Sequence, residues 1–276
     1  MRTSISRRLF GRACGLLGAL AFIGLTFSAA AGAQTVADIK KKGELTVGML
    51  VDFPPYGILN SSNEPDGYDA DVARLLAKQW GVKVNLVPVT GPNRIPYLQT
   101  NKVDLLIASL AITPERAKQV QFSAPYASAS IMLNAPKNSK IKAPADLKGV
   151  KVAVARASTQ DVALTAMAPE GTLIQRFDDD ASAVQALLSG QVDAIGCSTT
   201  VLSQIEKRMP GKYESKFALK QQYHGIVMRL GQDDLLKAVN AFVAQNRANG
   251  EFAKLYQKWL GIAMPEMPDN LEAVLK

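Results

Sequence analysis

The chain has few of the residues from which metal centres and disulfides are built. Among its 276 residues there are one histidine, His224, and two cysteines. Cys14 lies in a basic and apolar N-terminal segment that we expect to be removed, which leaves Cys197 without an intrachain partner. A structural zinc site needs four Cys or His ligands. We therefore expect no disulfide, no metal and no other cofactor.

Long apolar runs are also scarce. The longest, Leu16–Phe27, follows a basic start and precedes a small-residue cleavage site, which is typical of a secretory signal peptide. It is shorter than the roughly 20 residues that span a bilayer. We predict that residues 1–33 are a signal peptide, cleaved after Ala33. The adjacent Arg7 and Arg8 also resemble a twin-arginine signal, and the choice of export route stays open.

A strong charge of one sign is absent after the leader. The whole chain carries +8, but the leader holds four arginines and no acid, so the remaining 243 residues have 28 basic and 24 acidic side chains. No lysine or arginine cluster is interleaved with aromatic residues, and this argues against nucleic-acid binding. A chain of this length can bury a sizeable core in one large domain or two modest ones.

What the chain does contain is an alternation of strand-like and helix-like segments. Such a succession predicts a mostly parallel sheet covered by helices, hence an α/β fold. The predicted strands cover 45–50, 82–89, 103–109, 151–155, 172–177, 192–198 and 223–230, and the predicted helices 70–80, 93–101, 114–119, 159–167, 181–189, 233–249 and 251–260.

A weak internal repeat supports two sub-domains of like topology. Residues 98–109 (LQTNKVDLLIAS) and 187–198 (LLSGQVDAIGCS) both read as a helix end, a turn and an apolar strand ending in serine. Ligands of open α/β sheets bind beyond the carboxyl ends of the strands, so two facing edges would form a cleft. Chance similarity between helix-turn-strand units remains the alternative.

One stretch, Asp104–Tyr126, has the features of an anion site. Its apolar strand is followed by Thr113, a good helix N-cap, and by Pro114, which suits the first helical position. Free backbone N–H groups at a helix start attract anions. Arg116 lies in the same first turn and can bind a carboxylate through two hydrogen bonds. A solvated arginine on a helix surface is the alternative.

The same stretch carries a family resemblance. ASLAITPERAKQVQFSAPY and PDGYDADVARLLAKQWGVKV (65–84) are similar to motifs of the bacterial periplasmic amino-acid-binding proteins, solute-binding protein family 3 of ABC importers. The similarity runs from about 43 to 261. It implies a two-lobed fold, each lobe a mostly parallel sheet flanked by helices, joined by two hinge strands. Lobe 1 would comprise 43–128 and 224–262, lobe 2 129–223, and the C-terminal tail 263–276.

The resemblance also implies a carboxylate site. Its positions match Ser109, the backbone of Ala111, and Arg116, with Thr159 closing from the second lobe. Phe53 matches the aromatic residue that packs on the aliphatic part of the ligand, although a core position would also explain it. Ser158, just before Thr159, can equally serve as a helix cap.

Two departures from the family pattern bear on the ligand. Ser198 stands where most relatives have the aspartate that holds the α-ammonium, and Asp180 is either a substitute or only a helix cap. Arg94 resembles the glutamate/aspartate-binding branch, where it would contact a side-chain carboxylate, but Leu50 replaces that branch's further arginine. Arg156 is a candidate third cation, and a solvated Arg94 is the alternative. The predicted ligand-binding residues are Phe53, Arg94, Ser109, Ala111, Arg116, Ser158, Thr159, Asp180 and Ser198.

These features favour a periplasmic solute-binding protein, expected as a monomer, that delivers a small carboxylated solute to the membrane permease of an ABC transporter. The solute is expected to be an amino acid, and an acidic amino acid is one of the candidates. The alternative is an enzyme like cyclohexadienyl dehydratase, which is similar in fold. That reaction needs a general acid, but Cys197–Thr200 offers no carboxylate and His224 is poorly placed. A sensor domain is disfavoured because no signalling segment follows Gly261.

Overall fold

The computed structural model describes residues 34–275, so the leader predicted for 1–33 lies outside the described residues. The chain forms an eight-stranded sheet in the order β4-β1-β5-β10-β6-β9-β7-β8 and a small sheet of β2 and β3. The strands are β1 (Glu44–Leu50), β2 (Ile58–Leu59), β3 (Pro65–Asp66), β4 (Lys83–Val89), β5 (Leu105–Leu106), β6 (Gln121–Pro136), β7 (Lys151–Ala155), β8 (Leu173–Phe177), β9 (Ala194–Ser198) and β10 (Tyr213–Met228).

Helices flank the sheet, as an α/β fold requires. They are α1 (Val36–Lys42), α2 (Tyr68–Trp80), α3 (Arg94–Gln99), α4 (Pro114–Ala117), the 3₁₀ turn η1 (Pro144–Leu147), α5 (Thr159–Met167), α6 (Asp180–Leu188), α7 (Thr199–Arg208), α8 (Asp233–Ala248), α9 (Glu251–Leu260) and α10 (Leu271–Leu275). In the described chain, no helix combines the length and the apolar character needed to cross a membrane.

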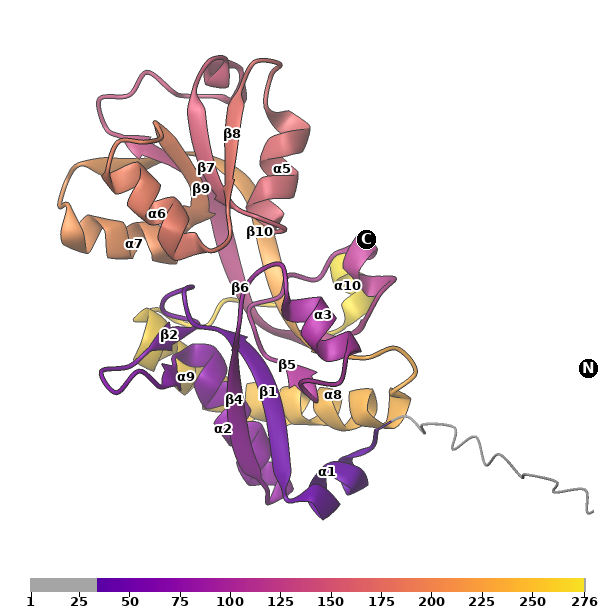
Figure 1. The fold of residues 1–276 in the computed structure, drawn as a ribbon. Helices are drawn as coiled ribbons and strands as arrows, with labels where there is room; N and C mark the ends of the chain where they lie inside the picture. Colours follow the sequence, from indigo (N-terminus) through magenta and orange to yellow (C-terminus); the bar gives the residue numbers. More distant parts are fainter. Residues whose placement is uncertain (1–33, 276) are drawn as a thin grey trace, which may run out of the picture. The chain divides into compact units, whose positions relative to one another are not determined.

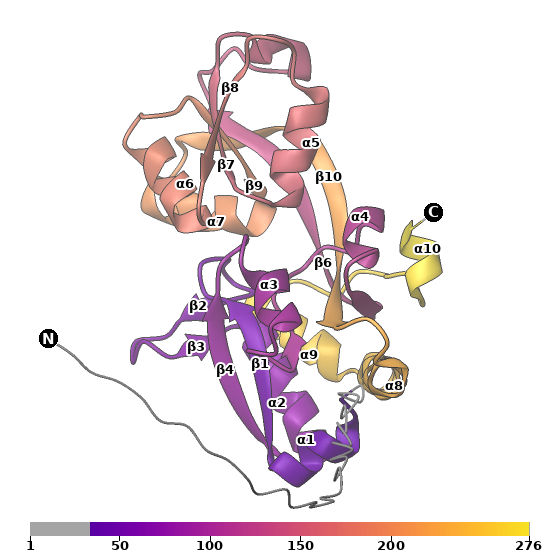
Figure 2. The same ribbon diagram turned by 45° about the vertical axis from the view of Figure 1, so that its right-hand side comes forward.

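The fold has two lobes built in the same way. In the first, β1 pairs in parallel with β4 and β5. In the second, β7 pairs in parallel with β8 and β9. Figures 1 and 2 show β1, β4, α2 and α3 gathered at one end of β6 and β10, and β7, β8, α5 and α6 at the other. The predicted two-lobed α/β architecture is therefore confirmed.

Two long antiparallel strands join the lobes. β6 and β10 have 16 residues each and pair along their lengths, with register shifts that include the steps around Gly225. The sequence pattern predicted a strand over 223–230, which overlaps only 223–228 of β10, and it marked no strand over β6. β6 pairs with β10 and, over 131–134, with β9. Most of its residues are buried on both faces of the sheet, so its burial does not alternate as in a strand with one solvated face.

Some predicted elements differ in length. The strand predicted over 103–109 is the two-residue β5, because Ser109 has a φ of +47° and the chain turns there. The helix predicted over 114–119 ends at Ala117. α7, which the sequence pattern did not predict, starts directly after β9 and is capped by Ser198.

Cys197, the cysteine among the described residues, lies in the core. Cys197 lies in β9, is fully buried, and its sulfur accepts a hydrogen bond from Asn134 Nδ2 at 3.2 Å. Burial raises the pKa of this thiol well above its ordinary value. The cysteine is therefore a packing residue of the second lobe.

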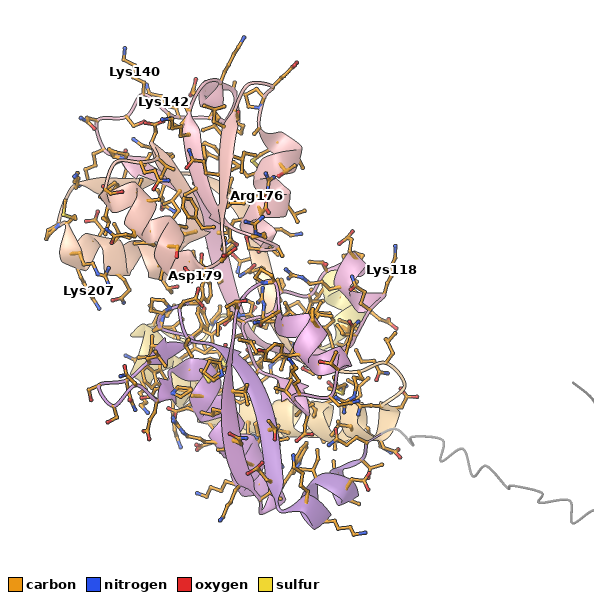
Figure 3. The ribbon with its side chains drawn as sticks, viewed as in Figure 1. Lys118, Lys140, Lys142, Arg176, Asp179 and Lys207 are labelled. Atoms are coloured by element: carbon orange, nitrogen blue, oxygen red, sulfur yellow. The ribbon has the colours of Figure 1, made fainter. Side chains whose placement is uncertain are left out.

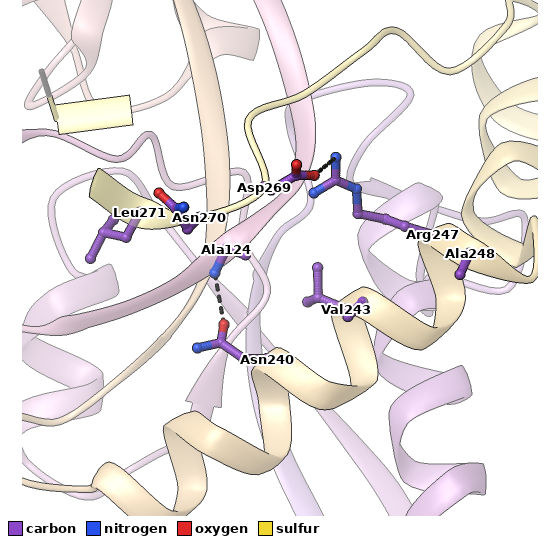
Figure 4. A pocket seen from close by; sticks show the side chains of 9 residues that line it. Ala124, Asn240, Val243, Arg247, Ala248, Asp269, Asn270 and Leu271 are labelled. Carbon is purple, nitrogen blue, oxygen red and sulfur yellow. Dashed lines mark hydrogen bonds and ion pairs between the residues drawn. The ribbon is translucent and has the colours of Figure 1, made fainter. Parts of the chain in front are cut away.

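Arg247 fixes the C-terminal tail to α8. Its guanidinium donates to the carbonyl oxygens of Met267 at 2.7 Å and Pro268 at 3.1 Å, and it forms an ion pair with Asp269 at 3.3 Å. The cavity between α8 and the tail, shown in Figure 4, has a volume of about 740 Å³. None of the predicted ligand-binding residues lines it.

Candidate ligand-binding site

A small cavity brings most of the predicted site residues together. Its volume is about 30 Å³, enough for about two water molecules. Eight predicted residues line it: Phe53, Arg94, Ser109, Ala111, Arg116, Ser158, Thr159 and Asp180. Leu50, Gln160 and Gln222 complete the lining, and the sequence interpretation had not assigned them to the site.

A tight loop after β1 carries Asp52 and Phe53. The backbones of Phe53 and Gly57 exchange two hydrogen bonds of 3.0 Å. A Cβ atom at Gly57 would lie 1.9 Å from the carbonyl oxygen of Leu50, so this close approach requires glycine. Phe53 is buried and stacks on Tyr56 with ring centroids 5.5 Å apart. The core role and the lining role of Phe53 are therefore both present.

The guanidinium of Arg116 donates hydrogen bonds to two backbone carbonyl groups. Nη1 donates to the carbonyl of Ala111 and Nη2 to that of Ala157, each at 2.9 Å, and the second bond crosses between the lobes. Burial lowers the pKa of Arg116 to about 9, and the nearby Arg94 adds to the decrease. Arg116 forms no ion pair with any described residue. An anionic ligand group would remove the cost of leaving this cation unpaired.

Arg94 is buried, whereas Arg116 is partly exposed. Its Nε donates to the carbonyl of Gly91 at 3.2 Å and its Nη1 to that of Ala108 at 3.0 Å. Burial lowers the pKa of Arg94, while the negative charges of Asp180 and Asp52 oppose that shift. The solvated alternative for Arg94 is therefore wrong.

Ser109 is positioned by a buried carboxylate behind it. Its hydroxyl donates to Asp69 Oδ2 at 2.7 Å, and its backbone N–H donates to the Tyr126 hydroxyl at 3.2 Å. Both donors of Ser109, its hydroxyl and its backbone N–H, are therefore already used in hydrogen bonds within the protein. Towards a ligand, its hydroxyl oxygen can only accept a hydrogen bond.

The second lobe contributes the start of α5. Ser158 caps the helix, accepting the N–H of Asp161 at 3.2 Å, and it also lines the cavity, so both predicted roles are compatible. The Thr159 hydroxyl donates to Gln222 Oε1. A ligand carboxylate would compete with Gln222 for this hydroxyl.

Gln222 is held in turn by a neutral histidine. Gln222 Nε2 lies 2.9 Å from His224 Nε2, and the Nδ1 atom of His224 is buried without a described partner. Burial and the charges of Arg94 and Arg116 lower the pKa of His224 to about 3. Because the ring is neutral, its Nε2 accepts the bond from Gln222 and its Nδ1 carries the hydrogen.

Asp180 is the first residue of α6, which the side chain of Asp179 caps. Figure 3 labels Asp179. The buried Asp180 carboxylate accepts a hydrogen bond from Gln160 Nε2 at 3.2 Å. Its backbone N–H donates to Asp52 Oδ2 at 2.8 Å, from the other lobe. Burial raises the pKa of Asp180 to about 7, and Asp52 adds to the increase. Neither Asp52 nor Asp180 forms an ion pair with any part of the chain that the structure describes.

Ser198 is the predicted site residue that the structure does not place in the lining. It is fully buried at the end of β9, accepts the N–H of Val201 at 3.2 Å, and its hydroxyl lies 2.7 Å from that of Thr200. Both bonds serve the first turn of α7. Asp180, from the neighbouring helix, supplies the carboxylate that lines the cavity.

The chain is similar to known proteins over most of its length. Residues 45–262 match the profile of the bacterial extracellular solute-binding proteins, family 3. The ABC transporter glutamine-binding protein GlnH of Bacillus subtilis (strain 168) is 33% identical over 232 residues, covering 82% of this chain and 85% of that protein. The L-cystine-binding protein TcyJ of Escherichia coli (strain K12) is 29% identical over 250 residues, covering 90% and 94%. A crystal structure of the ancestral amino acid-binding protein AncCDT-1, a precursor of cyclohexadienyl dehydratase, is 36% identical with a TM-score of 0.76, covering 82% of this chain and 99% of that one.

Proposed function

Because the chain belongs to family 3 of the bacterial extracellular solute-binding proteins, an amino-acid-binding family of ABC importers, we propose that it binds a zwitterionic amino acid between Arg116 and Asp180. The observation that carries this proposal is a cavity with buried charges of both signs and no ion pair between them. A zwitterion supplies one partner of each sign without changing the net charge of the site.

The α-carboxylate is assigned to Arg116. The guanidinium is already oriented by the carbonyls of Ala111 and Ala157, so little side-chain freedom is lost on binding. The Thr159 hydroxyl is a second donor to the carboxylate once its hydrogen bond to Gln222 is broken. Thr159 lies at the start of α5, where the helix dipole favours an anion.

The α-ammonium is assigned to Asp180. This carboxylate lines the cavity and forms no ion pair among the described residues. The nearby charge of Arg94 lowers its pKa only in part, and an ammonium would further favour its charged form. Ser198 stands where most relatives have the ammonium-binding aspartate, and its hydroxyl caps α7. In this assignment Asp180 takes the place of that aspartate.

Calorimetric titration with glutamine, glutamate and any amino acid that copurifies tests the proposal. Truncating one partner of a buried charge pair costs about 2–5 kcal/mol, so Arg116→Ala should weaken binding by roughly 30-fold to several thousand-fold. Arg74→Ala is the matched control, because Arg74 pairs with Asp66 and Asp71 and lines no part of the cavity. Wild-type affinity in Arg116→Ala would refute the assignment.

A preference for acidic amino acids is the second candidate. Arg94 supports it, since its guanidinium lines the cavity while two of its nitrogens are held by backbone carbonyls. In the same titrations, Arg94→Gln should then weaken glutamate far more than glutamine. Equal losses for the two ligands would remove this candidate.

The wider setting is proposed on the same basis. The relatives are binding proteins of transporters, and the function of this chain is binding rather than catalysis. We place the mature protein in the periplasm as a monomer that meets a membrane permease, exported with a leader cleaved after Ala33. The proposed lobe boundaries remain 43–128 with 224–262, and 129–223, with a tail over 263–276.

A further inference from the structure

A second cavity adjoins the first and shares one wall with it. Its volume is about 310 Å³, and Asp180 lines both cavities. The loop after β1 forms one side and helices α6 and α7 the other. Most of its lining is apolar; the residues are Val51, Asp52, Pro54, Ile58, Leu59, Asp180, Ala181, Val184, Val201, Gln204, Ile205 and Arg208.

Asp52 is a charged group in this lining that a bound cation would stabilise. One of its oxygens accepts the N–H of Asp180 at 2.8 Å, and the carboxylate has no ion-pair partner within the described residues. Burial raises the pKa of Asp52, the N–H of Asp180 lowers it, and the charge of Asp179 raises it again. A cation bound here would offset that burial.

The first cavity cannot hold a whole amino acid as it stands. About 30 Å³ admits about two water molecules, so a long side chain must occupy a neighbouring space. A third cavity, also of about 310 Å³, lies beyond Arg94 and Arg116 and includes Gln99 and Gln119 in its lining. The charged groups of the two flanking spaces differ: the second cavity has the carboxylates of Asp52 and Asp180 and the exposed Arg208, whereas the third has the guanidinium groups of Arg94 and Arg116 and no carboxylate.

We infer that the second cavity is the side-chain subsite and that it takes a basic amino acid, whose aliphatic stem packs on Val51 and Val184 and whose cation binds Asp52. The inference rests on the proposed function, in which Arg116 and Asp180 hold the main-chain groups of the ligand. An apolar side chain would bury Asp52 without a partner, and an acidic one would meet two carboxylates, with the exposed Arg208 as the one cation in this lining.

Lysine and norleucine provide the first test, because they share a stem and differ in the terminal ammonium. Titrated into the wild-type protein, lysine should bind at least about 30-fold more tightly than norleucine. In Asp52→Asn, which keeps an oxygen to accept the N–H of Asp180, that preference should fall to less than about 3-fold. Equal affinities in the wild type, an unchanged preference in the variant, or binding of glutamate without binding of lysine would overturn the inference.

Filling either flanking cavity provides the second test. Val184→Phe fills the second cavity and should weaken lysine at least about tenfold while leaving alanine within about twofold. Ile95→Phe places the same side chain in the third cavity and should leave lysine unchanged. The reverse pattern would assign the side chain to the third cavity and overturn the inference. Failure of the proposed function would be seen separately, as unchanged binding of every amino acid by Arg116→Ala.

Discussion

At the residue scale, a buried carboxylate behind the cavity determines how Ser109 is presented. Asp69, the second residue of α2, accepts hydrogen bonds from the hydroxyls of Tyr126 at 2.8 Å and Ser109 at 2.7 Å. It is fully buried, and burial raises its pKa to about 7. Its charged form is therefore less favourable in the folded protein than in the unfolded chain.

This predicts a stability that falls as the pH rises. Because the folded-state pKa of Asp69 lies above the ordinary value of 3.8, its stabilising contribution is complete below about pH 4 and is lost towards pH 7. The slope from this residue should reach at most about 1.4 kcal/mol per pH unit. Urea unfolding of Asp69→Asn between pH 4.5 and 7.5 should show a smaller slope than the wild type. Parallel curves would contradict the assignment.

At the scale of elements, each helix of the second lobe that follows a strand starts with a capping side chain. Ser158, Asp179 and Ser198 accept an N–H from the first turns of α5, α6 and α7. These caps bring the helix starts to the carboxyl ends of the strands, beside the cleft. Two of them, Ser158 and Ser198, are chemically alike but differ in whether they line the cavity.

Ser158 and Ser198 allow the capping role of a serine to be separated from its contribution to ligand binding. Ser158→Ala and Ser198→Ala should each lower the free energy of unfolding by about 1 kcal/mol, the usual cost of losing an N-cap. Ser158→Ala should also weaken ligand binding, whereas Ser198→Ala should leave it unchanged. Urea unfolding and calorimetric titration of both variants measure the two effects. A changed ligand affinity in Ser198→Ala would show that this serine does contribute to the site.

The sequence predicted elements well where local signals mark them. β7, α5 and α9 match their predicted bounds because caps, glycine and apolar periodicity delimit them. The resemblance implied a hinge strand here, but the sequence pattern did not mark β6, because a strand buried on both faces lacks the alternation of polar and apolar residues. The sequence interpretation located eight lining residues, most of them through the family resemblance. Gln222 was missed because its place in the site depends on its contacts with Thr159 and His224. Ser198 was assigned to the site by the resemblance, but its capping bonds depend on α7, which was not predicted.

At the scale of the whole molecule, two hydrogen bonds connect the lobes across the cleft. They are Arg116 to Ala157 and Asp180 to Asp52. Proteins of two lobes joined by hinge strands close around ligands, and a ligand shifts the population only as far as it binds the closed form more tightly. Both ends of the proposed ligand lie beside these bonds, so binding should favour the closed arrangement.

Small-angle scattering should therefore report a smaller radius of gyration with saturating ligand than without it. Protein freed of any copurified ligand by unfolding and refolding is the reference. Arg116→Ala at the same ligand concentration should keep the radius of the ligand-free protein, because both the ligand contact and a bond between the lobes are lost. A wild-type radius that does not respond to bound ligand would exclude closure as the response.

The buried thiol of Cys197 has a practical consequence. Maleimide dyes react with exposed thiolates, and burial together with the raised pKa makes Cys197 unreactive in the folded protein. With the leader removed, a cysteine introduced at Leu59, which is 46% exposed at the second cavity, would carry the label alone. The scaffold would then be a fluorescent biosensor that needs no further cysteine removal.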